Sequence, residues 1–345
     1  MKNWSGVCQV AAVYVGTVIG AGFATGREIV EFFTRFGFWG LLSILIAGCL
    51  FMILGSKIML LSIDIKAGSF EQLNEYLFGK RLAHIMNLLL LAMLVGVCAV
   101  MLAGAEALFA KQLNVPRFTG MLITAFLGLV VMAAGIKGLF IINVIVVPMM
   151  IAFNAAILFH VVPAGDVNLW LQIEDAGNGW FAVLSGISYA GFNLALAQAV
   201  LVPLAAEIND KKTVKWGGIL GGAFLTILLI SGHICLSGLR DPGVFEIPMA
   251  VIVRESAGSL YFIYILMIYG EIFTTLIGNT YGLERQLHQY FQVNSMWIVL
   301  FLLLVVCLIS LVKYGKLLGI LYPLFGYLSF AFLLLLLIKP AKGSA

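Results

Sequence analysis

The sequence predicts an all-α membrane protein of about ten transmembrane helices, arranged as two inverted halves of about five helices each. Three observations lead to this fold class. The 345 residues are 62% hydrophobic and 10% charged, whereas soluble domains carry about 25% charged residues. Apolar runs long enough to cross a bilayer recur along the whole chain. Two of these runs, half a chain apart, are interrupted by glycines near their middle.

The apolar runs of about 20 residues give the expected spans. They are residues 7–33, 39–61, 82–110, 118–134, 139–162, 180–207, 216–236, 260–283, 296–312 and 319–338. No polar stretch between them is long enough to fold separately, so we expect one transmembrane domain. An odd number of spans per half makes residues 1–162 and 179–338 inverted repeats. Residues 248–255 are expected to form either a short re-entrant helix or a cap over the outer vestibule.

The first span contains the most unusual stretch of the chain. Residues 15–29 read VGTVIGAGFATGREI, with four glycines within eleven positions. Each glycine costs a helix about 1 kcal/mol relative to alanine, so we expect a break around residues 20–25. Peptide groups freed inside a membrane are tolerated only where they line a cavity or are buried in protein. The break therefore predicts a binding site, although small residues also serve close helix packing in membranes.

The sixth span repeats part of this pattern. Residues 184–198 read LSGISYAGFNLALAQ, and their AGF falls 169 residues after the AGF of the first span. Glycine-interrupted segments at corresponding places in two halves point to the binding site of a secondary transporter. We therefore expect the sixth helix to be broken as well.

Charge and chemistry exclude several functions. Twelve of the 20 Lys and Arg residues fall on one side of the predicted spans, which favours both termini in the cytoplasm. The net charge of +4 is spread over loops, so we expect no nucleic-acid partner. Histidines and cysteines lack metal-ligand spacing, and no nucleophile elbow or phosphate loop is present. We therefore expect neither an enzyme nor a cofactor, beyond a possible coupling ion.

The first span also resembles the corresponding part of a known family. The run GTVIGAGFATGRE resembles the YkvI family of bacterial inner-membrane proteins. Breaks in the first and sixth of ten spans resemble the amino acid–polyamine–organocation superfamily, which has the LeuT-type fold. The resemblance implies a bacterial cytoplasmic membrane protein whose unwound segments hold a substrate. The substrate-binding residues would be Ala21, Gly22, Phe23, Ala24, Tyr189, Ala190, Gly191, Phe192 and Asn193. Their aromatic rings would wall a pocket, gate it, or pack as ordinary core.

The resemblance also implies a coupling-ion site. Sodium-coupled members place two hydroxyl residues of the eighth span opposite carbonyls of the first, here Thr274 and Thr275 opposite Gly20 and Phe23. The fifth span lacks the lysine that replaces sodium in some proton-coupled members, which favours Na⁺ over H⁺. Glu271 departs from the pattern, and an ionisable residue within a span is a functional candidate by default. It could carry a proton, add charge to the cation site, meet a cationic substrate, or pair with a base.

A cluster of charges follows the first break. Arg27, Glu28, Glu31 and Arg35 lie on the outer half of the first span. Among them Arg27, Glu31 and Arg35 have i, i+4 spacing and are expected to pair along one helix face. They would form either an outer gate, with Arg27 reaching across the vestibule, or a solvated helix end. Glu106, near the outer end of the third span, could reach the same vestibule.

Together these features predict a secondary active transporter of a small amine-containing solute, such as an amino acid or osmolyte. It would work by alternating access coupled to Na⁺ or H⁺, moving spans one, two, six and seven against the rest. Two alternatives stay open: a ligand-sensing receptor of the same fold that does not transport, and an uncoupled permease. The expected partners are the solute and the bilayer, with the chain a monomer or weak homo-oligomer.

Overall fold

The structure, a computed structural model, describes residues 4–116, 118–134, 149, 152–153, 156, 179–256, 258–291 and 293–339. Every regular element in this part of the chain is a helix. Six of the described helices are long and apolar enough to cross a membrane, and three shorter ones are apolar too. The molecule is therefore a multi-pass helical membrane protein. The predicted fifth span, residues 139–162, lies largely outside the described residues, so the ten-span count and the inverted repeat remain predictions.

The first span consists of three pieces, α1 (Trp4–Val18), α2 (Ala21–Ala24) and α3 (Arg27–Phe32). Gly20 separates the first two with an extended backbone, φ −135° and ψ −173°. Gly26 separates the last two with a left-handed φ of 77°, which residues with a Cβ atom adopt at a cost. The interruption thus lies within the predicted stretch, and two of its four glycines make the actual turns.

The second span is continuous but contains a wider turn. It comprises α4 (Phe38–Leu50), the π-helical segment η2 (Phe51–Gly55) and α5 (Ser56–Ile65). A π-turn leaves carbonyl groups without their usual partners. Here the Tyr14 hydroxyl of α1 donates to the Phe51 carbonyl at 3.0 Å. The irregular turn therefore ties the first span to the second.

The remaining elements follow the predicted order. They are α6 (Phe70–Gln112), α7 (Thr119–Ala134), α9 (Gly179–Ile208), α10 (Lys211–Ser237), α11 (Pro248–Ser256), α12 (Tyr261–Tyr290), α13 (Ser295–Ile309), α14 (Tyr314–Leu328) and α15 (Phe330–Ile338). A kink at Gly79, where φ is 75°, divides α6 into a short surface helix and a long span. The peptide 248–255, whose role was left open, forms the helix α11.

The predicted break in the sixth span is wrong, because α9 is helical from Gly179 to Ile208. Its glycines serve packing instead. A methyl group placed on Gly186 would lie 2.6 Å from the Ser43 carbonyl oxygen, and one on Gly191 would lie 2.9 Å from a methyl of Leu333. These glycines let neighbouring helices approach closely. Pro203, nearer the end of α9, has no backbone N–H and so removes one hydrogen bond from this otherwise continuous helix.

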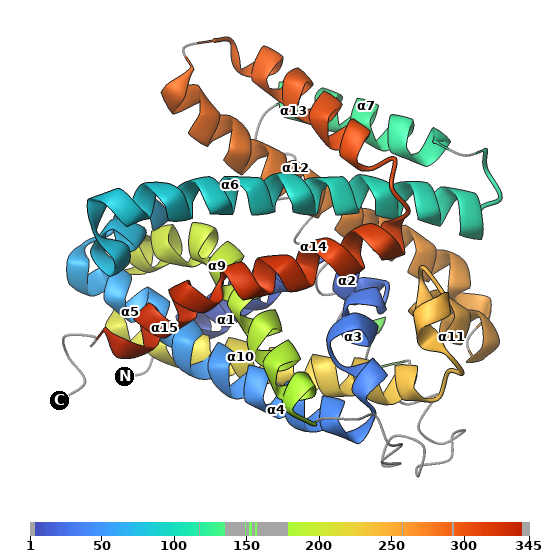
Figure 1. The fold of residues 1–345 in the computed structure, drawn as a ribbon, viewed down its shortest axis with the longest axis horizontal. Coiled ribbons are helices and arrows are strands. Elements are labelled where there is room, and N and C mark those ends of the chain that lie inside the picture. Colours follow the sequence, from blue (N-terminus) through green and yellow to red (C-terminus); the bar gives the residue numbers. More distant parts are fainter. Residues whose placement is uncertain are drawn as a thin grey trace.

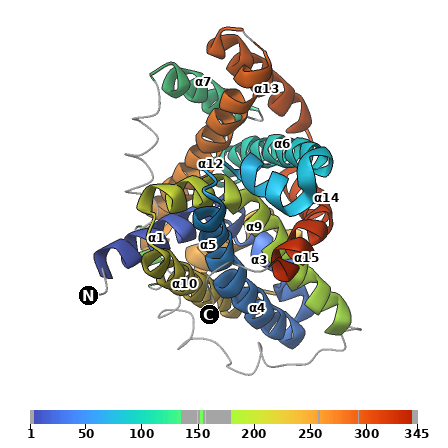
Figure 2. The same ribbon diagram turned by 90° about the vertical axis from the view of Figure 1, so that its left-hand side faces the viewer.

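The helices form two groups, which Figures 1 and 2 show on opposite sides of the molecule. In one group α1, α4, α5, α9 and α10 pack on one another, and in the other α6, α7, α12 and α13 do so. The helix α14 packs against both α9 and α6, while α2 contacts α12 and α6. The interrupted part of the first span therefore reaches from the first group to the second.

Two features of the surface and of the helix contacts fit a lipid environment. Large apolar side chains such as Leu88, Phe126 and Phe262 are strongly exposed, as expected for surfaces that face acyl chains. Contacts inside the first group depend on small residues, because methyl groups on Gly217 and Gly221 of α10 would clash with α1.

Candidate functional site

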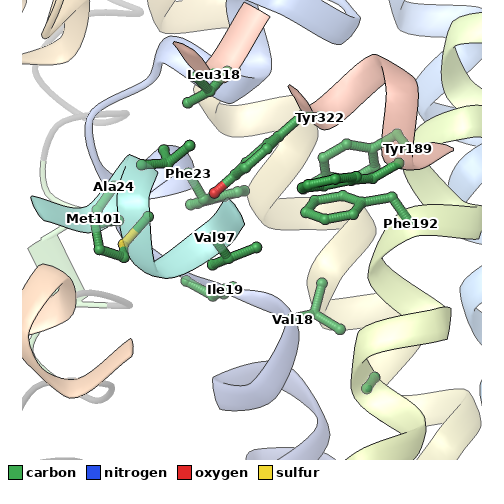
Figure 3. Close-up of a cluster of buried hydrophobic side chains, with 14 of the residues drawn as sticks. Val18, Ile19, Phe23, Ala24, Val97, Met101, Tyr189, Phe192, Leu318 and Tyr322 are labelled. Atoms are coloured by element: carbon green, nitrogen blue, oxygen red, sulfur yellow. The ribbon is translucent and has the colours of Figure 1, made fainter. Parts of the chain in front are cut away.

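The interrupted part of the first span contributes to a buried cluster of hydrophobic side chains, drawn in Figure 3. We call these side chains the central cluster. They are Val18, Ile19, Phe23, Ala24, Val97, Met101, Tyr189, Phe192, Leu318 and Tyr322. They come from the first span, from α6, from α9 and from α14, so the cluster lies where the two groups of helices meet.

Aromatic rings form one wall of the central cluster. Phe192 of α9 packs on Tyr322 of α14, with ring centroids 4.6 Å apart. Tyr189, one turn earlier, meets Phe33 edge-on at 4.9 Å and Phe51 at 5.9 Å. Figure 3 shows Tyr189 and Phe192 side by side, with the Tyr322 hydroxyl directed toward Phe23. The rings therefore line the space beside the interruption.

Groups from three distant helices form hydrogen bonds with Ala24 and Thr25 of the interruption. Tyr264 of α12 donates to the Ala24 carbonyl at 2.6 Å, and Tyr314 of α14 shares a hydrogen bond with the Thr25 hydroxyl at 2.8 Å. The backbone N–H of Met249 in α11 donates to the Thr25 carbonyl at 3.1 Å. These bonds hold the segment in place although it lacks a regular helix.

The nine predicted substrate-binding residues are all buried, but they are not equivalent. Phe23, Tyr189 and Phe192 bring their side chains together in the central cluster. Gly191 instead faces Leu333 of α15. Because α9 is continuous, Tyr189 to Asn193 can offer side chains but not unwound peptide groups, which corrects the prediction for the sixth span.

Of the predicted coupling-ion residues, Thr275 lies next to the first turn of the interruption. Its hydroxyl would be 3.6 Å from a methyl group placed on Gly20. Thr274 donates its hydroxyl to the Glu271 carbonyl of its own helix at 3.2 Å. The carbonyls of Gly20 and Phe23 already accept bonds from Ala24 and Gly26. Each carbonyl oxygen keeps a second lone pair.

Glu271 lies on the face of α12 that contacts the interruption. Tyr264 and Thr275, seven residues before and four after it, both touch the first span, and this spacing places all three on one helix face. The Glu271 side chain is 2% exposed, and within the described residues its Oε1 has no hydrogen-bond partner. A buried polar atom without a partner is costly, which marks it as a candidate ligand.

The predicted gate is partly rearranged. Glu31 and Arg35 form an ion pair of 2.6 Å. Arg27 does not join it, because its guanidinium donates to the carbonyls of Gly243 and Phe245, the latter at 3.0 Å. Arg27 therefore contacts the segment before α11. The gate hypothesis likewise had Arg27 reaching away from its own helix. Glu106 is partly buried on α6.

A cavity of about 230 Å³ adjoins this charged cluster. It lies between α3, the start of α9 and α14. It is lined by Phe32, Arg35, Phe36, Phe181, Ser185, Ser188, Pro323 and Tyr327. Because both Arg35 and aromatic rings face it, the cavity is a candidate vestibule above the central cluster.

Sequence reasoning missed two residues of the site. Tyr322 lies in the last apolar run, where an aromatic ring is not distinctive. Glu28 was grouped with the outer charges, yet its side chain is 4% exposed and lies over Gly22. An acidic residue two positions after a glycine was the available signal. The described residues contain no group of three or more His, Cys, Asp or Glu side chains that could hold a metal ion.

Solved transporters have this arrangement of helices. A crystal structure of the manganese transporter of Eremococcus coleocola, with an aromatic bis-isothiourea compound, matches with a TM-score of 0.65 and 15% identity, covering 96% of this chain and 78% of that chain. The inward-facing structure of Mhp1 matches with a TM-score of 0.64 and 14% identity, covering 94% and 73%. The chain therefore has the LeuT-type fold of membrane transporters.

Closer relatives define the family. A family model described as "Spore germination protein" matches residues 7–240. The "Uncharacterized membrane protein YkvI" of Bacillus subtilis (strain 168) is 45% identical over 338 residues, 96% of each chain. The "Uncharacterized protein YyaD" of the same organism is 24% identical over 343 residues, 98% of each chain. The chain belongs to the spore germination protein family and to the YkvI group that its first span predicted. It is a permease-type membrane protein and not an enzyme.

Proposed function

We propose that this protein is a secondary active transporter of a small amine-containing solute, such as an amino acid or a related osmolyte. The observation that carries the proposal is the interrupted first span, whose residues Ala21 to Gly26 lie buried between the two groups of helices. Secondary transporters place substrate and ion sites at such discontinuous helices. Solved proteins with the same fold are transporters, which supports this class.

The surroundings of the interruption support an organic solute. Aromatic rings such as Phe23, Phe192 and Tyr322 suit an apolar side chain, and they can also stabilise a cationic nitrogen through their π faces. One neighbour in fold is a manganese transporter. The absence of a metal-binding cluster among the described residues does not favour that cargo here. By the family resemblance, the peptide groups of Ala21 to Ala24 would contact the carboxylate of an amino acid.

We propose Na⁺ as the coupling ion, with H⁺ as the alternative. The Thr275 hydroxyl lies beside Gly20, 3.6 Å from where a Cβ atom on that glycine would be, and hard oxygen ligands suit such a cation. The unpartnered Glu271 oxygen would add negative charge to the same site. If the coupling ion is H⁺, Glu271 is the group that would carry it.

Transport would proceed by alternating access. The helices expected to move, those of spans one, two, six and seven, correspond to α1 to α5, α9 and α10. These helices largely pack as one group, which supports their moving as one body. The Arg27 bonds to the segment before α11 would close the outer side. We place both termini in the cytoplasm of a bacterial cell and expect a monomer or weak homo-oligomer.

A second candidate function is a ligand-sensing receptor that binds the solute without transporting it. The family description, spore germination protein, supports this alternative. An uncoupled permease is the third possibility. All three share the same binding site and differ in flux and in its dependence on ion gradients.

Uptake of radiolabelled amino acids and amines into proteoliposomes tests the proposal. Accumulation that requires an inward Na⁺ or H⁺ gradient is the expected result. Flux that ignores both gradients would identify an uncoupled permease. Binding, measured as ligand-induced thermal stabilisation, with no flux under any gradient would identify a receptor and overturn the transporter assignment.

A further inference from the structure

A second buried carboxylate, Glu28, follows the interruption. Its residue lies in α3, just after the left-handed turn at Gly26, and its side chain extends back over α2. A methyl group placed on Gly22 would collide with the Glu28 carboxylate. The carboxylate therefore rests directly on the backbone of the interrupted segment, and Gly22 provides the space for it.

The groups around Glu28 are neutral. The hydroxyl of Tyr189 and the side-chain amide of Asn193 are its hydrogen-bonding partners from α9. The hydroxyls of Tyr314 and Tyr322 from α14 lie close enough to interact electrostatically with the carboxylate. Among the described residues, no Lys, Arg or His stands among the groups that interact with this carboxylate.

The nearest basic residues are engaged elsewhere. The Arg27 guanidinium, on the adjacent residue, bonds the carbonyls of Gly243 and Phe245. Arg35 pairs with Glu31. A charged carboxylate buried at this depth without a cation costs several kcal/mol, and neutral donors offset only part of that cost. Such a carboxylate is either protonated or paired with a cation that the described residues do not supply.

We infer that Glu28 binds the cationic nitrogen of the solute. This inference rests on the proposed function and adds the residue that selects for charge. The Tyr189 and Tyr322 side chains lie near this carboxylate, and their rings would hold the cation further through their π faces. The groups that bond Glu28 come from α9, whereas Glu271 is carried by α12. The two carboxylates can therefore serve two different cations, Glu28 the solute and Glu271 the coupling ion.

The inference predicts selectivity for a cationic nitrogen. Thermal unfolding of the purified full chain would be measured with two matched pairs of compounds: L-leucine and its α-hydroxy analogue, and putrescine and butanediol. Only the amine of each pair should raise the unfolding temperature of the wild type. Glu28→Gln should weaken binding of the best amine at least about ten-fold, as expected for loss of a buried charge pair. Glu28→Asp should retain part of the affinity.

Two controls keep the test decisive. Glu255→Gln removes an exposed carboxylate of α11 outside the central cluster, and it should bind the amine as the wild type does. Glu28→Gln keeps partners for Tyr189 and Asn193, so its unfolding temperature without ligand should stay close to that of the wild type. Glu28-dependent amine binding without uptake in proteoliposomes would uphold this inference while the transporter proposal fails.

Three results would overturn the inference. These are equal stabilisation by the amines and their hydroxy analogues, unchanged amine affinity in Glu28→Gln, and no stabilisation by any amine of the panel. Gradient-driven uptake of a solute without regard to its charge would also overturn it, while leaving the transporter proposal intact.

Discussion

At the scale of single residues, the two neighbouring threonines of α12 have different surroundings. The Thr274 hydroxyl donates to a carbonyl of its own helix, which is a common arrangement for a membrane threonine. The Thr275 side chain instead contacts Gly20, where the first span is interrupted. Of the two hydroxyls predicted to bind Na⁺, Thr275 is therefore the better placed.

We expect Thr275→Ala to abolish the Na⁺ dependence of uptake, because it removes a ligand oxygen next to Gly20. Thr275→Ser keeps the hydroxyl and should restore it. Thr274→Ala is the matched control and should alter Na⁺ stimulation by less than about two-fold, as its hydroxyl supports only the local helix. The measurement is initial uptake rate against Na⁺ concentration in proteoliposomes. Full Na⁺ stimulation in Thr275→Ala would reject the sodium site.

Glu271→Gln should change how uptake depends on pH. In the wild type, protonation of Glu271 removes negative charge next to the proposed cation site, so uptake should fall as the pH is lowered. The glutamine variant lacks that charge at every pH, so its uptake should be low and nearly independent of pH. Glu255→Gln, at an exposed position on α11, should keep the wild-type profile. An unaltered profile in Glu271→Gln would make Glu271 a structural residue.

Residue type could be read from the sequence, but side-chain direction could not. Glu271 and Thr275 stand out because polar residues are rare inside apolar runs; the structure places Thr275 beside Gly20 and buries Glu271 on the same helix. Glu28 was missed because the direction of its side chain depends on the left-handed backbone of Gly26, and that side chain lies next to Gly22. Arg27 was expected to pair with Glu31 from their spacing, but the carbonyls before α11 compete successfully for its guanidinium.

At the scale of elements, the glycines of the two glycine-rich segments, residues 15–29 and 184–198, have different structural roles. In the first span Gly20 and Gly26 adopt non-helical backbone conformations that end one helical piece and begin the next. In α9 the glycines remain helical and allow close contacts with α4 and α15. Sequence pattern alone does not separate these uses, since both need a residue without a side chain. The break in the first span could therefore be predicted, whereas the same reasoning failed for α9.

Gly26→Ala should destabilise the protein and reduce transport. A left-handed backbone costs a residue with a Cβ atom about 1–2 kcal/mol. The new methyl would also lie 3.1 Å from Leu236 and 3.2 Å from Met249. The midpoint of chemical denaturation in detergent should fall accordingly.

Gly278→Ala on α12 provides the comparison for Gly26→Ala. A methyl group there meets open space, and alanine favours a helix by about 1 kcal/mol over glycine. This variant should be as stable as the wild type or more so. If Gly26→Ala were equally stable, the left-handed turn would not be needed to fold the interruption.

At the scale of the whole molecule, the grouping of helices defines what can move. The helices α1, α4, α5, α9 and α10 make most of their contacts with one another, and α6, α7, α12 and α13 do the same. The segment α2 contacts the second group directly. A shift of one group against the other would therefore change the surroundings of the central cluster, which is what alternating access requires.

Distances between spin labels can test this motion. Ile227→Cys on α10 and Phe126→Cys on α7 place exposed labels on different groups, and Phe126→Cys with Leu304→Cys on α13 places both on one group. The exposed native cysteines, Cys8 and Cys49, would first be replaced by serine. The pair across the groups should show two distance populations whose ratio changes with Na⁺ and solute, because each ligand stabilises one conformation. The pair within one group should keep a single distance. If the pair across the groups also showed one distance that did not change with Na⁺ or solute, movement of one group against the other would be excluded.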